Sequence, residues 1–187
     1  MEVMRQLAAA AVTGLLIAGP GWAECPPAPD HADALTGLIE RVQAAPDERS
    51  ARIISNEMWE LWADAPDQRA QELLDEGMSR REAYDFKGAV VAFDALVEYC
   101  PDYAEGYNQR AFVNFIRQDY DGALPDLERA LALSPRHIAA MTGQALTLAA
   151  LDRKAEAALV LREALEMNPW LGERALLSVL EAEEEEL

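Results

Sequence analysis

The chain has 187 residues, of which 51% are hydrophobic and only 7% aromatic, a composition typical of an alanine- and leucine-rich helical domain. Its 34 acidic side chains outnumber the 16 basic ones, giving a net charge of −18 at pH 7. Because nucleic acids and anionic membranes attract proteins through lysine and arginine, this charge argues against both as partners. A partner that is steered by charge is expected to be basic.

A secretory signal peptide is predicted over residues 1–23. Arg5 provides a positive start, residues 7–19 form an apolar run, and Gly21-Trp22-Ala23 has the small-x-small pattern of a cleavage site. The apolar run is too short to span a bilayer comfortably. We therefore expect a soluble, exported, periplasmic protein without a membrane span after cleavage. An uncleaved anchor is the alternative.

Residues 24–69 are expected to form an extended, proline-rich arm and a helical hairpin. The apolar spacing predicts helices from about residue 31 to 45 and from 48 to about 63. This hairpin lacks the small-residue pattern of the units that follow, so we interpret it as an N-terminal cap or a degenerate repeat. Trp59 and Trp62 share one helix face, and packing against the first full repeat is favoured over an aromatic binding platform.

A period of 34 residues organises the middle of the chain. Pro101, Pro135 and Pro169 are spaced 34 residues apart without an insertion or deletion. The same frame aligns small residues, which mark the places where paired helices approach closely. They are Gly77, Ala111 and Ala145 in one column and Ala89, Ala123 and Ala157 in another. A constant period of this length indicates a stacked-repeat architecture.

The central unit, residues 104–137, shows how one period is built. Its apolar spacing predicts two antiparallel helices over about residues 104–118 and 122–133. Asp102 is placed to cap the first helix, with Glu105 three residues on to complete a capping box. The following hairpin is expected to repeat the same design.

These landmarks resemble the tetratricopeptide repeat, and the resemblance covers three units over residues 70–171. Leu73 and Met141 depart from the usual tryptophan of the first helix, Leu96 replaces a small residue, and Pro125 falls inside a helix, where it removes one backbone hydrogen bond. The resemblance implies an all-α, right-handed superhelical solenoid of antiparallel helix hairpins.

Residues 172–187 are expected to form a C-terminal capping helix and an acidic tail. Leu176, Leu177 and Leu180 can cover the last hairpin. The closing EAEEEEL is interpreted as a solvated charge run that favours solubility.

Cys25 and Cys100 are the only cysteines of the chain. An even count in a chain expected to enter an oxidising compartment predicts a structural disulfide, with two free thiols as the alternative. Such a bond would join the N-terminal arm to the end of the first repeat, and chain-entropy arguments give it a stabilisation of about 4 kcal/mol.

No pattern in the sequence indicates catalysis. The two histidines, His31 and His137, have no partner at metal-ligand spacing and are expected to be exposed loop residues. The sequence also lacks a nucleophile elbow and a phosphate-binding glycine loop. We therefore predict no enzymatic activity, no cofactor and no metal.

The resemblance implies that the first helices of successive units line a concave groove. The candidate groove residues are Leu74, Met78, Arg81, Asn108, Phe112, Phe115, Ile116 and Leu146. Their mostly apolar character favours an apolar peptide or an amphipathic helix of another protein, with Asn108 bonding the ligand backbone and Arg81 meeting an acid. The Lys, Arg and Asn clamp with which some relatives hold a peptide carboxylate is absent.

The expected function is a non-catalytic protein-protein interaction module of the cell envelope. Two alternatives stay open. The groove could be occupied by the protein's own N-terminal hairpin. Alternatively, the protein could act as a scaffold or assembly factor, or as a regulatory subunit of an envelope enzyme complex, through another surface.

Overall fold

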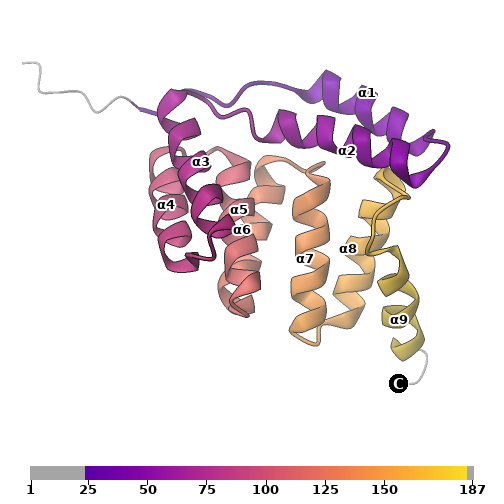
Figure 1. Ribbon diagram of the computed structural model, residues 1–187. Coiled ribbons are helices and arrows are strands. Elements are labelled where there is room, and N and C mark those ends of the chain that lie inside the picture. The colour runs from indigo at the N-terminus through magenta and orange to yellow at the C-terminus, as the bar shows by residue number, and fades with distance from the viewer. Residues whose placement is uncertain (1–23, 185–187) are drawn as a thin grey trace, which may run out of the picture.

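The computed structural model describes residues 24–184, and this part of the chain contains nine α-helices and no strand (Figure 1). The helices are α1 (Ala32–Gln43), α2 (Glu48–Trp62), α3 (Gln68–Glu82), α4 (Phe86–Tyr99), α5 (Ala104–Ile116), α6 (Tyr120–Leu133), α7 (Ile138–Ala150), α8 (Lys154–Met167) and α9 (Arg174–Glu184). The predicted signal segment and residues 185–187 lie outside the described part. None of the helices formed by residues 24–184 is long and apolar enough to cross a membrane.

Aspartate side chains begin four of these helices. Each accepts a hydrogen bond of 2.8–3.1 Å from the backbone N–H three residues on, which satisfies a donor that has no partner within the helix. The capping residues are Asp47, Asp67, Asp85 and Asp119, for α2, α3, α4 and α6 respectively.

The predicted capping box at the start of α5 is wrong. The helix begins after Tyr103 without a side-chain cap, and Asp102 instead pairs with Arg129 at 3.0 Å. Glu105 is only 1% exposed and turns into the protein interior, where its carboxylate contacts the His137 ring at 2.7 Å.

The period of 34 residues is also present in the backbone. Three helix pairs, α3 with α4, α5 with α6 and α7 with α8, are joined by tight turns. Each turn contains one residue in the left-handed region, Tyr84, Gln118 or Asp152, with φ of 60–61°. Each pair also packs against the next, so the units stack into a solenoid of antiparallel hairpins, as the sequence predicts.

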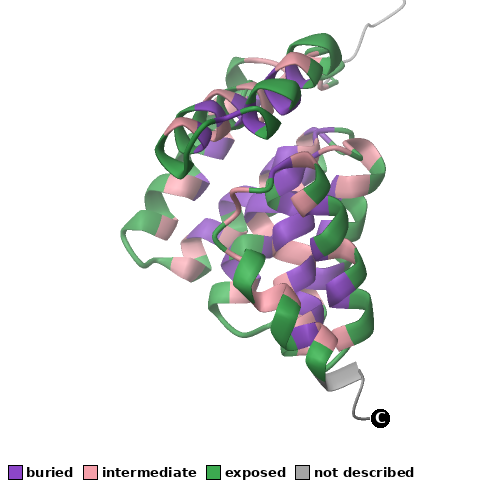
Figure 2. Ribbon diagram, turned by 90° about the vertical axis from the view of Figure 1, so that its right-hand side faces the viewer, coloured by how far each residue is buried: buried purple, intermediate pink, exposed green. Residues whose placement is uncertain are grey.

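The core of the stack lies between the paired helices, and the exposed residues lie on its outer faces (Figure 2). Ala111 and Ala123 are fully buried where α5 and α6 approach closely, and Leu127 fills the space beside them. Pro125 lies inside α6. At the end of the stack Leu180 of α9 is 3% exposed and packs into the core of the last hairpin with Leu176 and Leu177.

The N-terminal hairpin lies across one end of the repeat helices instead of adding a further layer to the stack (Figure 1). Helices α1 and α2 form an apolar cluster that includes Ile138 at the start of α7 and Met167, Trp170 and Leu171 at and after the end of α8. The hairpin thus packs on the third unit, far from it in sequence.

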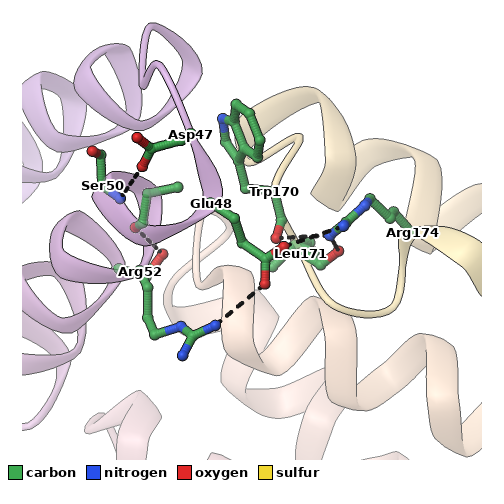
Figure 3. A network of polar contacts seen from close by, with 9 residues as sticks. Asp47, Glu48, Ser50, Arg52, Trp170, Leu171 and Arg174 are labelled. Carbon is green, nitrogen blue, oxygen red and sulfur yellow. Dashed lines mark hydrogen bonds and ion pairs between the residues drawn. The ribbon is translucent and has the colours of Figure 1, made fainter.

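Polar contacts also join the N-terminal hairpin to the third unit. Gln43 donates to the backbone carbonyl of Glu166 at 2.8 Å, and Asn168 donates to the Ser55 hydroxyl at 3.2 Å. Figure 3 shows the neighbouring network, in which Arg174 pairs with Glu48 at 3.3 Å and also donates to the carbonyls of Trp170 and Leu171.

The other end of the hairpin is tied to the first unit. Cys25 and Cys100 form a disulfide with their Cα atoms 5.1 Å apart, which confirms the predicted pairing. The Tyr103 hydroxyl donates to the backbone carbonyl of Trp62 at 2.8 Å. Burial raises the pKa of Tyr103, so the phenol keeps its proton and remains a donor. The hairpin therefore spans the stack from the first unit to the third.

Candidate peptide-binding groove

A groove of about 500 Å³ lies on the face formed by the first helices of the three units. Helices α5 and α7 supply most of its surface and α3 supplies Arg81, because the stacking of the hairpins places these helices side by side. Helix α2 and the segment between α8 and α9 border it. Its lining consists of Trp59, Arg81, Asn108, Gln109, Ala111, Phe112, Phe115, Leu127, Ala139, Thr142, Gly143, Leu146, Thr147, Leu171 and Glu173.

Five of the predicted groove residues lie together in this lining: Arg81, Asn108, Phe112, Phe115 and Leu146. Phe112 is 47% exposed and lines the groove, so much of its apolar side chain is open to a ligand. The ring of Phe115 packs at 5.4 Å from that of Tyr120, which holds it at the groove wall.

Three of the predicted residues do not line this groove. Leu74 is fully buried in the core of the first hairpin and offers no surface to a ligand. Met78 is partly buried and packs against the same core. Ile116, the last residue of α5, is 38% exposed outside the groove. The spacing within a helix could not separate these positions, because they depend on how closely neighbouring elements cover each helix.

Ten of the fifteen lining residues were not among the predicted ones, and three of these lie outside the three helix pairs: Trp59 of α2, and Leu171 and Glu173 after α8. Trp59 is 41% exposed, so it is not the core residue that the sequence favoured. The crossing of the hairpin over the stack brings Trp59 to the groove, and the chain after the third unit supplies Leu171 and Glu173. The hairpin therefore borders the groove without filling it.

The two charged residues of the lining, Arg81 and Glu173, have no ionic partner among the residues that the structure describes. Arg81 donates to the Gln109 side-chain carbonyl, and its guanidinium lies over the Phe112 ring at 5.1 Å from the centroid. Within residues 24–184, no carboxylate lies within 4.0 Å of Arg81 and no basic side chain within 4.0 Å of Glu173. Both charges are thus available to a ligand.

A buried polar network lies beneath the groove. The Glu105 carboxylate accepts hydrogen bonds from Asn108 at 3.0 Å, from Gln109 at 2.5 Å and from the His137 ring at 2.7 Å. Asn108 and Gln109 also line the groove, and Gln109 holds Arg81. The network therefore positions the polar groups of the groove from behind.

His137 is fully buried, so its predicted place in an exposed loop is wrong. Its Nδ1 accepts from the backbone N–H of Ala140, its Nε2 contacts Glu105, and Trp62 of the hairpin stacks on its ring at 4.2 Å. Both ring nitrogens are engaged and the pair is closed to solvent. The arrangement is suited to joining the hairpin to the second and third units, not to proton transfer with a ligand.

The described residues contain no group of three or more His, Cys, Asp or Glu side chains able to hold a metal ion. His31 contacts Asp64 at 2.8 Å near the start of α1 and is partly exposed.

Comparison with curated proteins gives relatives with the same kind of repeat. A TPR repeat-containing protein of Rhizobium etli is 30% identical over 114 residues, which cover 61% of this chain and 56% of the relative. The tetratricopeptide repeat protein 36 homolog of Nematostella vectensis is 40% identical over 72 residues, 38% of this chain and 40% of the relative. The chain thus spans about half or less of the length of these relatives. No family model matches it.

Solved structures share the fold at low identity. The first TPR domain of Spaghetti (RPAP3), bound to the HSP90 peptide SRMEEVD, aligns with a TM-score of 0.60 at 21% identity, covering 62% of this chain and 92% of that one. The Sgt2 TPR domain from Aspergillus fumigatus aligns with a TM-score of 0.60 at 16% identity, covering 64% and 82%. A double mutant of MamA covers 84% of this chain with a TM-score of 0.59.

Proposed function

The repeated units of this chain are tetratricopeptide repeats, and from that premise we propose that the protein is a non-catalytic interaction module. In this proposal it binds an apolar segment of a partner protein in the groove between α3, α5 and α7. Similar domains such as the first of Spaghetti are described in complex with a peptide, which supports the class of ligand.

The observation that carries the proposal is the exposure of two aromatic side chains on one groove. Trp59 and Phe112 are 41% and 47% exposed and belong to the same lining. Large apolar groups left open in a concave site are typical of peptide recognition, because a ligand that covers them gains the free energy of removing them from water.

We also propose that the protein works in the cell envelope. The disulfide between Cys25 and Cys100 supports an oxidising compartment. The net charge of −18 favours approach by partners with basic surfaces.

A crosslinking experiment in cells tests the groove. A photoreactive amino acid at position 112 should trap a specific partner that mass spectrometry identifies, and Phe112→Ala should weaken that complex without loss of fold. Val91 on α4 is a matched control, since it is 68% exposed and apolar but does not line the groove. A photoreactive group at position 91 should not trap the partner that is captured from position 112, and Val91→Ala should leave the binding of that partner unchanged.

The reverse pattern would contradict the groove proposal. Capture of a specific partner from position 91, with none from position 112, favours a scaffold or regulatory subunit that uses the outer face of the stack.

A further inference from the structure

The two charges of the groove stand at its opposite ends. Arg81 belongs to the first unit, whereas Glu173 follows the third, and Phe112 and Leu146 lie on the helices between them. Helix α3 contacts α5 and α5 contacts α7, so this order in the chain is also the order along the groove. The site is therefore basic at one end, apolar in the middle and acidic at the other end.

From this arrangement we propose that the groove binds its partner segment in one direction, with a carboxylate of the segment at Arg81, a large apolar side chain between Trp59 and Phe112, and a basic group at Glu173. The inference rests on the proposed function and adds the charge order of the ligand to it.

Arg81 is prepared for this role. In the described part of the chain, Arg81 has no carboxylate partner that a ligand would have to displace. The Gln109 carbonyl and the Phe112 ring hold its guanidinium in place. Gln109 is anchored in turn by Glu105. A held guanidinium loses little conformational entropy when it binds a carboxylate, and it can bind both oxygens at once.

The dimensions favour an extended segment. Adjacent helix axes lie about 8–10 Å apart, so two steps along the stack place the charged ends about 20 Å apart. Extended chain covers this distance in roughly six residues. A helix needs about 13 residues to cover the same distance, at 1.5 Å per residue.

Three synthetic six-residue peptides with blocked ends and a Phe-Leu centre test the charge order on the full chain. The mixed peptide has Asp at one end and Lys at the other, the second has Asp at both ends, and the third has Lys at both. Calorimetry at about 0.15 M salt, where the Debye length is about 8 Å, limits the effect of the overall charge. The mixed peptide should bind about fivefold more tightly than either of the others.

Reversing the charge of Arg81 or Glu173 should change which of the three peptides binds most tightly. Arg81→Glu should bind the peptide with two lysines best, and Glu173→Arg the peptide with two aspartates. The double variant should return to the mixed peptide, now bound in the opposite direction. A photoreactive group beside the Asp of the mixed peptide reports the direction, since it should label α3 or α5 in the natural protein and the segment after α8 in the double variant.

Glu82→Arg is the matched control, because Glu82 is exposed on α3 next to Arg81 but does not line the groove. It should leave the order of the three peptides unchanged. Equal affinity of all three peptides for every variant overturns the charge order, and the groove proposal then stands only if replacing the central Phe by Ala still weakens binding. Absence of binding by all three peptides, or binding that is indifferent to that Phe, contradicts both proposals.

Discussion

Gly77 of α3 packs directly against the ring of Phe93 in α4. A Cβ added to Gly77 would lie 2.3 Å from Cε1 and 2.5 Å from Cζ of that ring. The equivalent columns of the next two units hold Ala111 with Leu127 and Ala145 with Leu161. The missing methyl group and the larger partner therefore compensate each other within the first hairpin.

Gly77→Ala should lower the free energy of unfolding by about 1–3 kcal/mol, because the new methyl group overpacks a fully buried contact. Adding Phe93→Leu should recover part of that loss, since the double variant has the Ala and Leu combination of the other two units. Urea denaturation measures both. Gly37→Ala is the control, with nothing within 4 Å of the added Cβ, and should stabilise the helix slightly. A double variant less stable than Gly77→Ala would contradict this explanation.

Reduction of the disulfide should lower the free energy of unfolding by up to about 4 kcal/mol, because the bond closes a long loop and restricts the unfolded chain. Cys25 and Cys100 are 75 positions apart in the sequence. Cys25→Ser should show the same loss and no further response to reductant. Mass spectrometry after alkylation should find two modified thiols only in the reduced protein. Two modified thiols in the untreated protein would show that the disulfide is absent.

Glu105→Ala should cost about 3 kcal/mol of unfolding free energy, because it leaves three buried donors without their acceptor. These donors belong to Asn108, Gln109 and His137. Because Trp62 stacks on His137, its fluorescence should also report the disturbed hairpin. Glu82→Ala, at an exposed position, should change stability by no more than about 0.5 kcal/mol. Equal effects of the two variants would show that the network contributes little.

Lowering the pH should reduce the stability that Asp67 contributes at the start of α3. The hydrogen bond from the Tyr99 hydroxyl, followed by that from the Ala70 backbone N–H, holds the pKa of Asp67 below its usual value. A carboxylate whose pKa is lower in the folded state stabilises the protein above the unfolded pKa of about 3.9, and loses that effect as the pH falls toward the folded pKa.

The measurement is urea denaturation at a series of pH values from 6 to 3. Asp67→Asn, which keeps a capping side chain without a titrating group, should flatten the fall in unfolding free energy below about pH 4. Tyr99→Phe removes the main cause of the lowered pKa and should flatten it as well. An unchanged slope in both variants would exclude Asp67 as a source of the acid sensitivity.

Repetition made the solenoid predictable from sequence. Each small residue has its large partner about 16 positions along, each turn recurs after 34 residues, and a hairpin of this length can bury its apolar face only against the next one. Such contacts are local or separated by one period, so Pro135, Ala111 and Leu127 carry the information for them. The disulfide was predictable for a simpler reason, since Cys25 and Cys100 are the only cysteines.

The groove was only partly predictable, because its outer border comes from elements outside the period. The positions expected to face the groove in the first helix of each unit correctly predicted Arg81, Asn108 and Phe112. The same set of positions also predicted Leu74, which the core of the first hairpin covers completely.

By itself, then, the sequence determined the helices, their turns and their pairing, because these depend on hydrogen bonds and packing between neighbours in the chain or one period apart. Only the tertiary structure decided where the N-terminal hairpin lies. Its apolar face matches the combined ends of several units, a shape that no single segment encodes. That placement buries His137 under Trp62 and brings Trp59 to the groove.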